Sequence, residues 1–224
     1  MTTIEKPTTC CTPNRPATSQ IIDAQVALDP VIAAKLKDAA IAAEGGTGLV
    51  GTARAGIAND GETPLRKTRI RSFRVSATTV TNAEFKAFVD ATGYVTEAER
   101  IGWSFVFWAQ VPETIEMTQA VPEARWWRRV DGANWRDING PETQADTWHP
   151  DHPVVQISWN DARAYCTWVG GRLPTEAEWE HAARGGLGDV KFPWGDALPN
   201  DTDHFPCNIW QGRFPEINSA RDGY

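Results

Sequence analysis

The chain has 224 residues, of which 29 are acidic and 22 basic, so its formal net charge is −7. An acidic balance argues against a general nucleic-acid-binding or anionic-membrane surface, because both require an excess of Lys and Arg. A composition of 41% hydrophobic and 23% charged residues is typical of a folded domain. No apolar run reaches the roughly 18 residues that span a bilayer, and the first residues do not resemble a secretion signal. We therefore expect a cytoplasmic protein that binds neither nucleic acid nor membrane.

Residues 1–28 mix Thr, Pro, Cys and Asn with little apolar patterning, which predicts a flexible extension. Cys10 and Cys11 lie in this extension, where a flexible thiol pair is favoured over a metal site. An Asp-Pro pair then supplies an N-cap and a proline for the first helical turn. Together with a narrow apolar stripe, it predicts a helix over 29–44 that a Gly pair ends.

The segment from Gly46 to Gly51 matches G-x-G-x-x-G, the fingerprint of dinucleotide binding. That fingerprint requires a strand before it and a helix after it, whereas a helix is predicted before it here and loop residues follow. We therefore reject nucleotide binding and favour a strand and a turn. Apolar residues at strand spacing predict two short strands, at 67–75 and at 152–158.

Three further segments carry the start signal of a helix. A Ser or Thr followed three residues later by an acidic residue forms a capping box, in which each side chain bonds the backbone of the other residue. Such boxes begin the helices predicted at 81–92, 158–169 and 175–184. Few strands and many Trp- and Gly-rich irregular stretches accompany these helices. The fold class predicted is therefore α+β with low regular secondary structure.

Common catalytic and metal-binding motifs are absent from the sequence. It has no G-x-S-x-G or Walker motif, and no two His at i,i+4 spacing on one helix. A structural role in a turn is favoured for His149 and His152. For Glu176, Glu178 and Glu180, capping and surface ion pairs are favoured over acid–base catalysis.

Eight separated blocks are recognisable in consistent order from about residue 45 to the end of the chain. They are residues 80–85, 92–99, 102–107, 132–136, 152–162, 171–180, 192–195 and 208–215. In these blocks the sequence strongly resembles the formylglycine-generating enzyme (sulfatase-modifying factor) family. The resemblance implies an elaborated C-type-lectin-like fold. It also implies an oxidase that uses molecular oxygen to convert the Cys of a Cys-x-Pro-x-Arg segment, in an unfolded or nascent sulfatase, to formylglycine.

The resemblance implies two metals. Calcium would be held by the side chains of Asn208 and Asp222 and by the backbone carbonyls of Ile209 and Tyr224, since oxygen ligands suit a hard cation. Copper would be held by two active-site Cys and would bind the substrate thiolate, but the family blocks that carry this pair do not occur up to Tyr224. Residues 29–224 thus resemble the N-terminal two-thirds of the domain, truncated before the catalytic Cys. We expect copper only in the complete protein, no catalytic residue in this chain and an inactive chain.

Cys166 and Cys207 do not match the copper-binding pair, although Cys166 matches a position that some members use in a structural disulfide. Trp126 matches a Trp that lines the substrate-peptide groove in the family, with simple packing as an equal alternative. Trp103 falls where some relatives carry an acidic residue that pairs with the substrate Arg, and an indole can stack on a guanidinium instead.

Two alternatives to the oxidase are a non-catalytic, lectin-like binding protein of the same superfamily and a sulfoxide synthase. The second is disfavoured because 45 N-terminal residues are too few for an iron-binding helical domain. If part of the domain is missing, apolar surface should be exposed around the Trp-rich segment 103–135.

Overall fold

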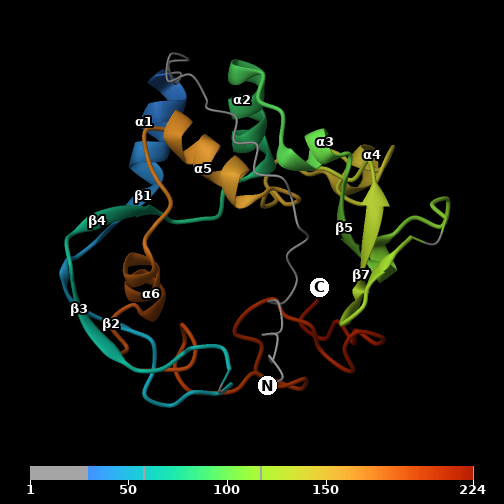
Figure 1. Ribbon diagram of the computed structural model, residues 1–224. Coiled ribbons are helices and arrows are strands. Elements are labelled where there is room, and N and C mark those ends of the chain that lie inside the picture. The colour runs from blue at the N-terminus through green and yellow to red at the C-terminus, as the bar shows by residue number, and fades with distance from the viewer. Residues whose placement is uncertain (1–29, 58, 117, 224) are drawn as a thin grey trace, which may run out of the picture. The chain divides into compact units, whose positions relative to one another are not determined.

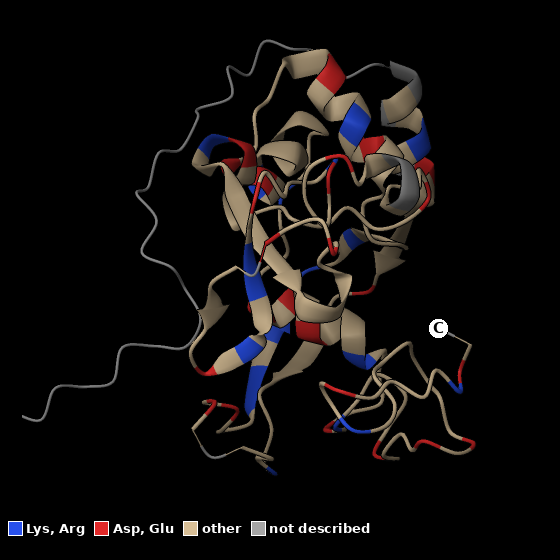
Figure 2. Ribbon diagram, turned by 90° about the vertical axis from the view of Figure 1, so that its right-hand side faces the viewer, with Lys and Arg blue, Asp and Glu red and all other residues tan. Residues whose placement is uncertain are grey.

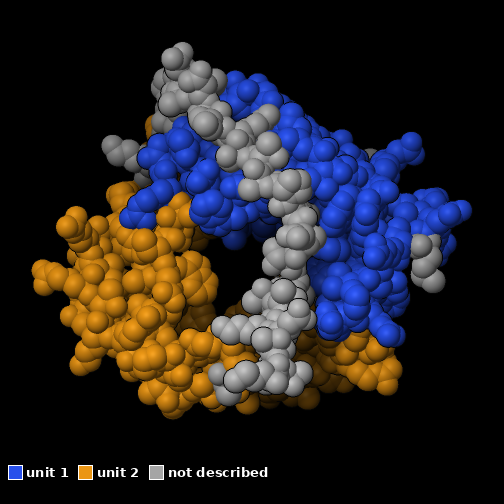
Figure 3. Space-filling model, in the orientation of Figure 1, with its two compact units in different colours: residues 1–29, 79–172 blue, residues 30–78, 173–224 orange. Residues whose placement is uncertain are grey.

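The computed structural model describes residues 30–57, 59–116 and 118–223. The extension predicted over 1–28, with Cys10 and Cys11, lies outside these residues, as does Tyr224. The described chain divides into two compact units (Figure 3). The first unit contains residues 79–172, and the second contains 30–78 and 173–223.

The first unit combines helices with a three-stranded antiparallel sheet (Figure 1). Its helices are α2 (Asn82–Thr92), α3 (Glu97–Ile101), α4 (Gln144–Thr147) and α5 (Trp159–Trp168), with a 3-10 helix, η1, at Trp108–Gln110. Its strands are β5 (Trp103–Phe107), β6 (Ala120–Val121) and β7 (Ala124–Asp131), in the order β5-β7-β6.

Aromatic side chains from α2 and α5 form the core of the first unit. Phe85 and Phe88 of α2 and the loop residue Trp135 are fully buried. The Phe85 and Trp135 rings meet edge to face with centroids 5.2 Å apart, and Phe88 packs 5.5 Å from Trp168 of α5. Large rings bury much apolar area each, so a few of them stabilise a unit that has little regular structure.

The second unit contains two two-stranded antiparallel sheets and two helices. In one sheet β1 (Ala40–Ala43) pairs with β4 (Phe73–Ser76), and in the other β2 (Gly46–Val50) pairs with β3 (Arg66–Ile70). The helices are α1 (Pro30–Ala39) and α6 (Glu176–Arg184), and α6 packs on β2. From 185 to 223 the chain forms turns, with one isolated bridge between Phe192 and Gly195.

Capping boxes begin four of the helices. The three predicted boxes, at Thr81, Ser158 and Thr175, are all formed, so the helices expected at 81–92, 158–169 and 175–184 are confirmed to within a residue or two. A fourth box, Thr96 with Glu99, begins α3. Helix α3 was not predicted, although the spacing of its capping box is the same.

The helix predicted over 29–44 was too long. Helix α1 ends at Ala39, and the next four residues form β1, which pairs with β4 from Ala40↔Ser76 to Ala43↔Phe73. The expected apolar stripe consists mainly of Ala, which buries little area, so strand pairing prevails over helix propensity in this stretch.

The strand predicted at 67–75 is divided into β3 and β4. The two strands separate at Arg71 and Ser72, opposite Gly45. A Cβ atom on Gly45 would lie 2.5 Å from the backbone nitrogen of Ser72. The two backbones therefore approach each other closely where the regular pairing is interrupted, and only Gly fits there.

The strand predicted at 152–158 was wrong. Pro153 forms only an isolated bridge with Thr81, and the Val154 N–H donates to the carbonyl of Val80 at 2.9 Å. Gln156 then adopts a φ of 59°, which is incompatible with a strand. The predicted class, a mixed α+β fold with low regular secondary structure, is confirmed.

Neither sign of charge is confined to one part of the chain: Figure 2 shows Lys and Arg interspersed with Asp and Glu. None of the helices described is long and apolar enough to cross a bilayer.

Candidate functional site

The pairing of β5 with β7 creates an aromatic face on the sheet of the first unit. Residues directly opposite each other on antiparallel strands share a face. Three such pairs, here called the aromatic face, are Trp103↔Asp131, Phe105↔Arg129 and Phe107↔Trp127. All six side chains reach solvent at least in part. The opposite face carries Val106 and Val130, which are buried in the core.

Trp103 already stacks on a guanidinium. The guanidinium carbon of Arg129 lies 4.8 Å from the Trp103 ring centroid, within the range of a cation–π contact. The Nε–H of Arg129 also donates to Oδ1 of Asp131 at 3.0 Å. Phe105 packs edge to face against Trp103, with centroids 5.1 Å apart, and so restricts the orientation of the indole.

Trp126 lies on the other face of the same sheet. Exposure alternates along β7, and Trp126 falls with the more buried residues Ala124, Arg128 and Val130. Trp103 and Trp126 therefore do not form one continuous surface, although the sequence assigned both to substrate binding. Strand register determines this separation, and neither strand was predicted from the sequence.

A hollow of about 350 Å³ lies beside the aromatic face, with Phe105 and Trp127 in its wall. Gln156 also lines it and is fixed by three hydrogen bonds. Its Oε1 accepts from the Ser104 hydroxyl at 2.6 Å, and its Nε2 donates to the carbonyls of Phe105 and Ile138, each at 2.9 Å. Gln156 thus holds β5 in place, which stiffens this wall before any ligand arrives. No residue pattern in the sequence indicated this role of Gln156.

The residues expected to hold calcium lie in the irregular part of the second unit. Gln211, 1% exposed, ties this stretch together. The Ser219 N–H donates to the carbonyl of Gln211 at 2.8 Å, and the Asp222 N–H donates to its Oε1 at 3.0 Å. The Oδ2 atom of Asp222 is buried, whereas Asn208 is exposed. The structure thus places Asp222 next to Gln211. Gln211 follows Asn208 by three residues in the sequence.

The chemistry of this donor set suits calcium, because amide, carbonyl and carboxylate oxygens are hard ligands. The fourth expected ligand, Tyr224, lies outside the described residues, and Ile209 would contribute only its carbonyl. Within the described part of the chain, no cluster of three or more His, Cys, Asp or Glu is placed to hold a metal. Calcium binding by Asn208, Ile209, Asp222 and Tyr224 therefore stays a prediction.

The two described cysteines are not expected to bind copper. Cys166 and Cys207 are free thiols, the first in the first unit and the second in the second. Burial raises the pKa of the Cys166 thiol. Copper(I) binds the thiolate, so a raised pKa makes Cys166 a poorer ligand at neutral pH. That Cys166 and Cys207 do not serve as the copper-binding pair stays a prediction.

A larger hollow, of about 990 Å³, lies within the second unit. Glu180 lines it and accepts from the Gly51 N–H at 3.0 Å and from Arg184 at 2.8 Å. Arg184 donates in turn to the Gly51 carbonyl at 2.6 Å. These charges pair with one another, so the end of the G-x-G-x-x-G segment is an anchoring point for α6. The strand favoured for this segment is present as β2.

The acidic residues of α6 have the structural roles expected of them. Glu178 completes the capping box of Thr175, and Glu176 lies 3.6 Å from Arg66 in an exposed ion pair. His149 and His152 lie in a turn whose backbone carbonyls accept hydrogen bonds from Asn82.

Exposure of the Trp-rich segment is mixed. Trp108 and Trp127 are 42% and 41% exposed, whereas Trp135 is fully buried. The apolar surface expected between 103 and 135 is thus present on and beside the aromatic face, and absent at Trp135.

Comparisons with known proteins all indicate the same family. A family profile described as "Sulfatase-modifying factor enzyme 1-like domain" matches residues 28–224. The chain is 55% identical over 166 residues to the formylglycine-generating enzyme of Thermomonospora curvata, covering 74% of this chain and 54% of that protein. It is 50% identical over 181 residues to the Bos taurus formylglycine-generating enzyme, covering 80% of this chain and 48% of that protein.

A third relative carries a different description. The mouse protein named inactive C-alpha-formylglycine-generating enzyme 2 is 46% identical over 182 residues, covering 80% of this chain and 57% of that protein. The chain therefore spans about half the length of the curated relatives it matches.

Proposed function

Because the chain belongs to the sulfatase-modifying factor family, we propose that it forms part of a formylglycine-generating oxidase. The reaction proposed is conversion of the Cys in a Cys-x-Pro-x-Arg segment of a sulfatase to formylglycine, with molecular oxygen as oxidant. The observation that carries this proposal is the 48–55% identity to bacterial and mammalian proteins of that name. The elaborated C-type-lectin-like fold belongs to the same proposal.

The contribution proposed for this chain is docking of the substrate peptide. An unfolded sulfatase segment is extended, and exposed aromatic rings provide apolar contact area for such a segment. The aromatic face offers rings from both strands and a rigid neighbouring wall at Gln156. We assign Trp103 to the substrate Arg, and Trp126 to a peptide portion that passes around the end of the sheet to its other face.

The metals of the complete enzyme are part of the proposal. Copper would supply a soft centre that binds the substrate thiolate, but the described thiols do not fit this centre. Calcium, held by Asn208, Ile209, Asp222 and Tyr224, would fix the turn-rich stretch that Gln211 organises. Because Cys166 and Cys207 do not match the copper-binding pair of the family, we propose that residues 1–224 by themselves do not catalyse the oxidation.

One specific observation favours a second candidate function. The identity of 46% to relatives named inactive is close to that of the named enzymes. A non-catalytic protein with the same aromatic face would bind the sulfatase segment without oxidising it.

Two measurements on the chain test these proposals. Titration with a fluorescent Cys-x-Pro-x-Arg peptide should show saturable binding that a peptide of the same composition in scrambled order does not reproduce. Incubation with copper(I), oxygen and the unlabelled peptide, followed by mass spectrometry, should show no formylglycine. Failure to bind the ordered peptide would contradict the substrate assignment, and formylglycine from residues 1–224 alone would contradict the proposed inactivity.

A further inference from the structure

Strand β3 and the residues that follow it form a dense basic stretch. Five of the nine residues from Arg66 to Arg74 are Lys or Arg, and none is acidic. The rest of the chain contains 17 basic and 29 acidic residues, which gives it a net charge of −12. This stretch therefore has a charge opposite to that of the remaining sequence, and it attracts negatively charged ligands to one place on the second unit.

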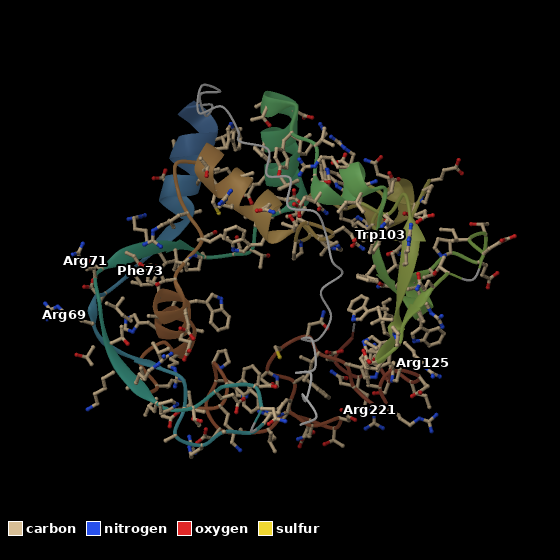
Figure 4. All side chains as sticks on the ribbon, in the orientation of Figure 1. Arg69, Arg71, Phe73, Trp103, Arg125 and Arg221 are labelled. Carbon is tan, nitrogen blue, oxygen red and sulfur yellow. The ribbon has the colours of Figure 1, made fainter. Side chains whose placement is uncertain are left out.

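Strand register places Lys67 and Arg69 on the face of the β2–β3 sheet that points away from α6. The other face carries Gly48 and the buried Ile70. A Cβ atom on Gly48 would lie 3.3 Å from Nδ1 of His181, so this is the face on which α6 packs. Because side chains alternate along a strand, Lys67 and Arg69 point in the opposite direction. Figure 4 shows the Arg69 side chain extending outward from the ribbon.

Three cations of this stretch are not neutralised within the unit. Lys67, Arg69 and Arg71, here called the basic stripe, are exposed and form no ion pair within the described part of the chain. Their neighbour Arg66 differs, since it lies 3.6 Å from Glu176. Residues two apart on an extended chain are roughly 7 Å apart, so the three positive charges follow one another at about this interval.

The outer edge of β3 is open to a further strand. Its sheet has only two strands among the described residues, so the alternate N–H and C=O groups of β3 that point away from β2 have no strand beside them. An open edge of this kind can accept an extended segment from another chain. Exposed Lys and Arg protect such an edge from neutral and basic strands, because they repel or fail to attract them. The same charges attract an acidic strand.

The surroundings favour an acidic polypeptide over a nucleic acid. Proteins that bind single-stranded nucleic acid combine cations with aromatic rings on which the bases stack. Here the residues opposite Lys67 and Arg69 are Leu49 and Thr47, so this face carries no aromatic ring. An extended peptide presents every second side chain on one face at the same interval of roughly 7 Å. Carboxylates at alternate positions therefore match the spacing of the basic stripe.

From these observations we propose that β3 is a docking edge for an extended acidic segment of a partner protein. The segment pairs with β3 as a third strand and presents Asp or Glu at alternate positions to Lys67, Arg69 and Arg71. Main-chain hydrogen bonds supply the affinity, and the basic stripe selects acidic over neutral segments. This docking edge belongs to the second unit, whereas the aromatic face belongs to the first, and it does not depend on the proposed oxidase.

Fluorescence titration of residues 1–224 with labelled peptides tests the inference. The probe is a short peptide with Glu at every second position and Thr or Val between. It should bind more tightly than a peptide of the same composition whose Glu residues form one block, and added salt should weaken binding by screening the exposed charges. Arg69→Gln should weaken binding about 2- to 5-fold. Arg213→Gln is the matched control and should leave it unchanged, because Arg213 is an exposed Arg of the same unit outside the basic stripe.

Charge reversal gives a stricter test of the selection. Lys67→Glu/Arg69→Glu/Arg71→Glu should no longer bind the Glu peptide and should bind the corresponding peptide with Lys in place of Glu. Binding of the Lys peptide also shows that the variant is folded. A reversed variant that has an unchanged circular dichroism spectrum and binds neither peptide would contradict the inference. If the reversed variant does not fold, the comparison of Arg69→Gln with Arg213→Gln decides.

Two measurements test whether the peptide is added as a strand. A Glu peptide with methyl groups on its central backbone nitrogens keeps its charges but loses main-chain donors, so it should bind about 10-fold more weakly. Hydrogen–deuterium exchange of the amides in 66–70 should slow when the unmodified peptide binds. Equal binding of the methylated peptide, with unchanged exchange in β3, would exclude strand addition.

Other polyanions distinguish the remaining outcomes. Oligodeoxythymidylate and vesicles that contain phosphatidylserine should bind more weakly than the alternating Glu peptide at the same salt concentration. Tighter binding of either one would show a general polyanion surface and overturn the inference. The proposed oxidase fails or holds independently, because none of these titrations involves the Cys-x-Pro-x-Arg peptide.

Discussion

The hydroxyl of Tyr94 donates a 2.9 Å hydrogen bond to the carboxylate of Asp161, which lies 67 residues further along the chain. Asp161 is fully buried and also accepts from the backbone N–H groups of Glu97 and Ser158, at 3.1 and 2.7 Å. One carboxylate thus joins the start of α3 to the start of α5. Burial, together with the charge of Asp161, raises the pKa of the Tyr94 hydroxyl, which stays a donor at all physiological pH values.

Asp161→Ala should lower the free energy of unfolding by about 2–4 kcal/mol, because it removes a capping box and leaves several buried donors without an acceptor. Tyr94→Phe should cost only about 1 kcal/mol, since the backbone donors to Asp161 remain. Urea denaturation followed by circular dichroism measures both. Equal losses from the two variants would show that Asp161 does not join the two helices as described.

Trp135 is expected to be the most costly single Trp to remove. It is fully buried against Phe85, so Trp135→Ala should lower the free energy of unfolding by about 3–5 kcal/mol. Trp159 is the control: it is 63% exposed, and Trp159→Ala should change stability by at most about 0.5 kcal/mol. A similar loss from both variants in the same urea titration would contradict the assignment of Trp135 to the core.

Gly51 is required for close packing of backbone segments. A Cβ atom at this position would lie 2.7 Å from the Glu62 carbonyl oxygen, and the φ of 75° is strained for other residues. Gly51→Ala should therefore cost about 2–4 kcal/mol. Gly61 has a similar φ of 72° but nothing within 4 Å of a Cβ atom, so Gly61→Ala should cost only about 1 kcal/mol. Thermal unfolding of both variants compares them, and equal shifts would exclude the steric explanation.

Two aspartates in the second unit should make the stability of the chain depend on pH in the acidic range. The Thr52 hydroxyl, which is hydrogen-bonded to Asp189, lowers the pKa of the Asp189 carboxyl. The Arg54 guanidinium beside Asp196 lowers the pKa of the Asp196 carboxyl. A carboxyl whose pKa is lower in the folded state than in the unfolded state stabilises the fold. This contribution is fully present when the pH is above the unfolded-state pKa of 3.8, and it is lost as the pH falls through the folded-state pKa. The unmodified chain should therefore be more stable than Asp189→Asn/Asp196→Asn at about pH 5, and the difference should shrink towards about pH 3. A difference that grows on acidification, measured by urea titration, would contradict this account.

Local signals in the sequence were sufficient for the helices that begin with a capping box. The reciprocal bonds at Thr81, Ser158 and Thr175 form between residues three apart, so they depend little on the rest of the fold. The end of α1 was not predictable in the same way. Residues 40–43 become a strand because they meet Phe73–Ser76, a partner some 30 residues away.

In the candidate site, too, some features could be predicted from local sequence and others depend on strand pairing. The family resemblance at Trp103 and Trp126 suggested aromatic contacts with a peptide, but their placement on opposite faces follows from the register of β5 on β7. Asp131 gave no signal in the sequence, since an exposed acidic residue is common on any surface. Its relation to Trp103 exists only once the two strands are paired. The role of Gln156 was hidden for a further reason, because it depends on an unusual backbone conformation with a φ of 59°.

Hydrogen–deuterium exchange of the chain with and without a Cys-x-Pro-x-Arg peptide tests the central claim most directly, that the β5–β7 sheet docks the substrate of a formylglycine-generating oxidase. The peptide should slow exchange of the amides in 103–107 and 124–131, and a scrambled peptide should not. Unchanged exchange in both strands at saturating peptide, or protection confined to residues of the second unit, would contradict the claim.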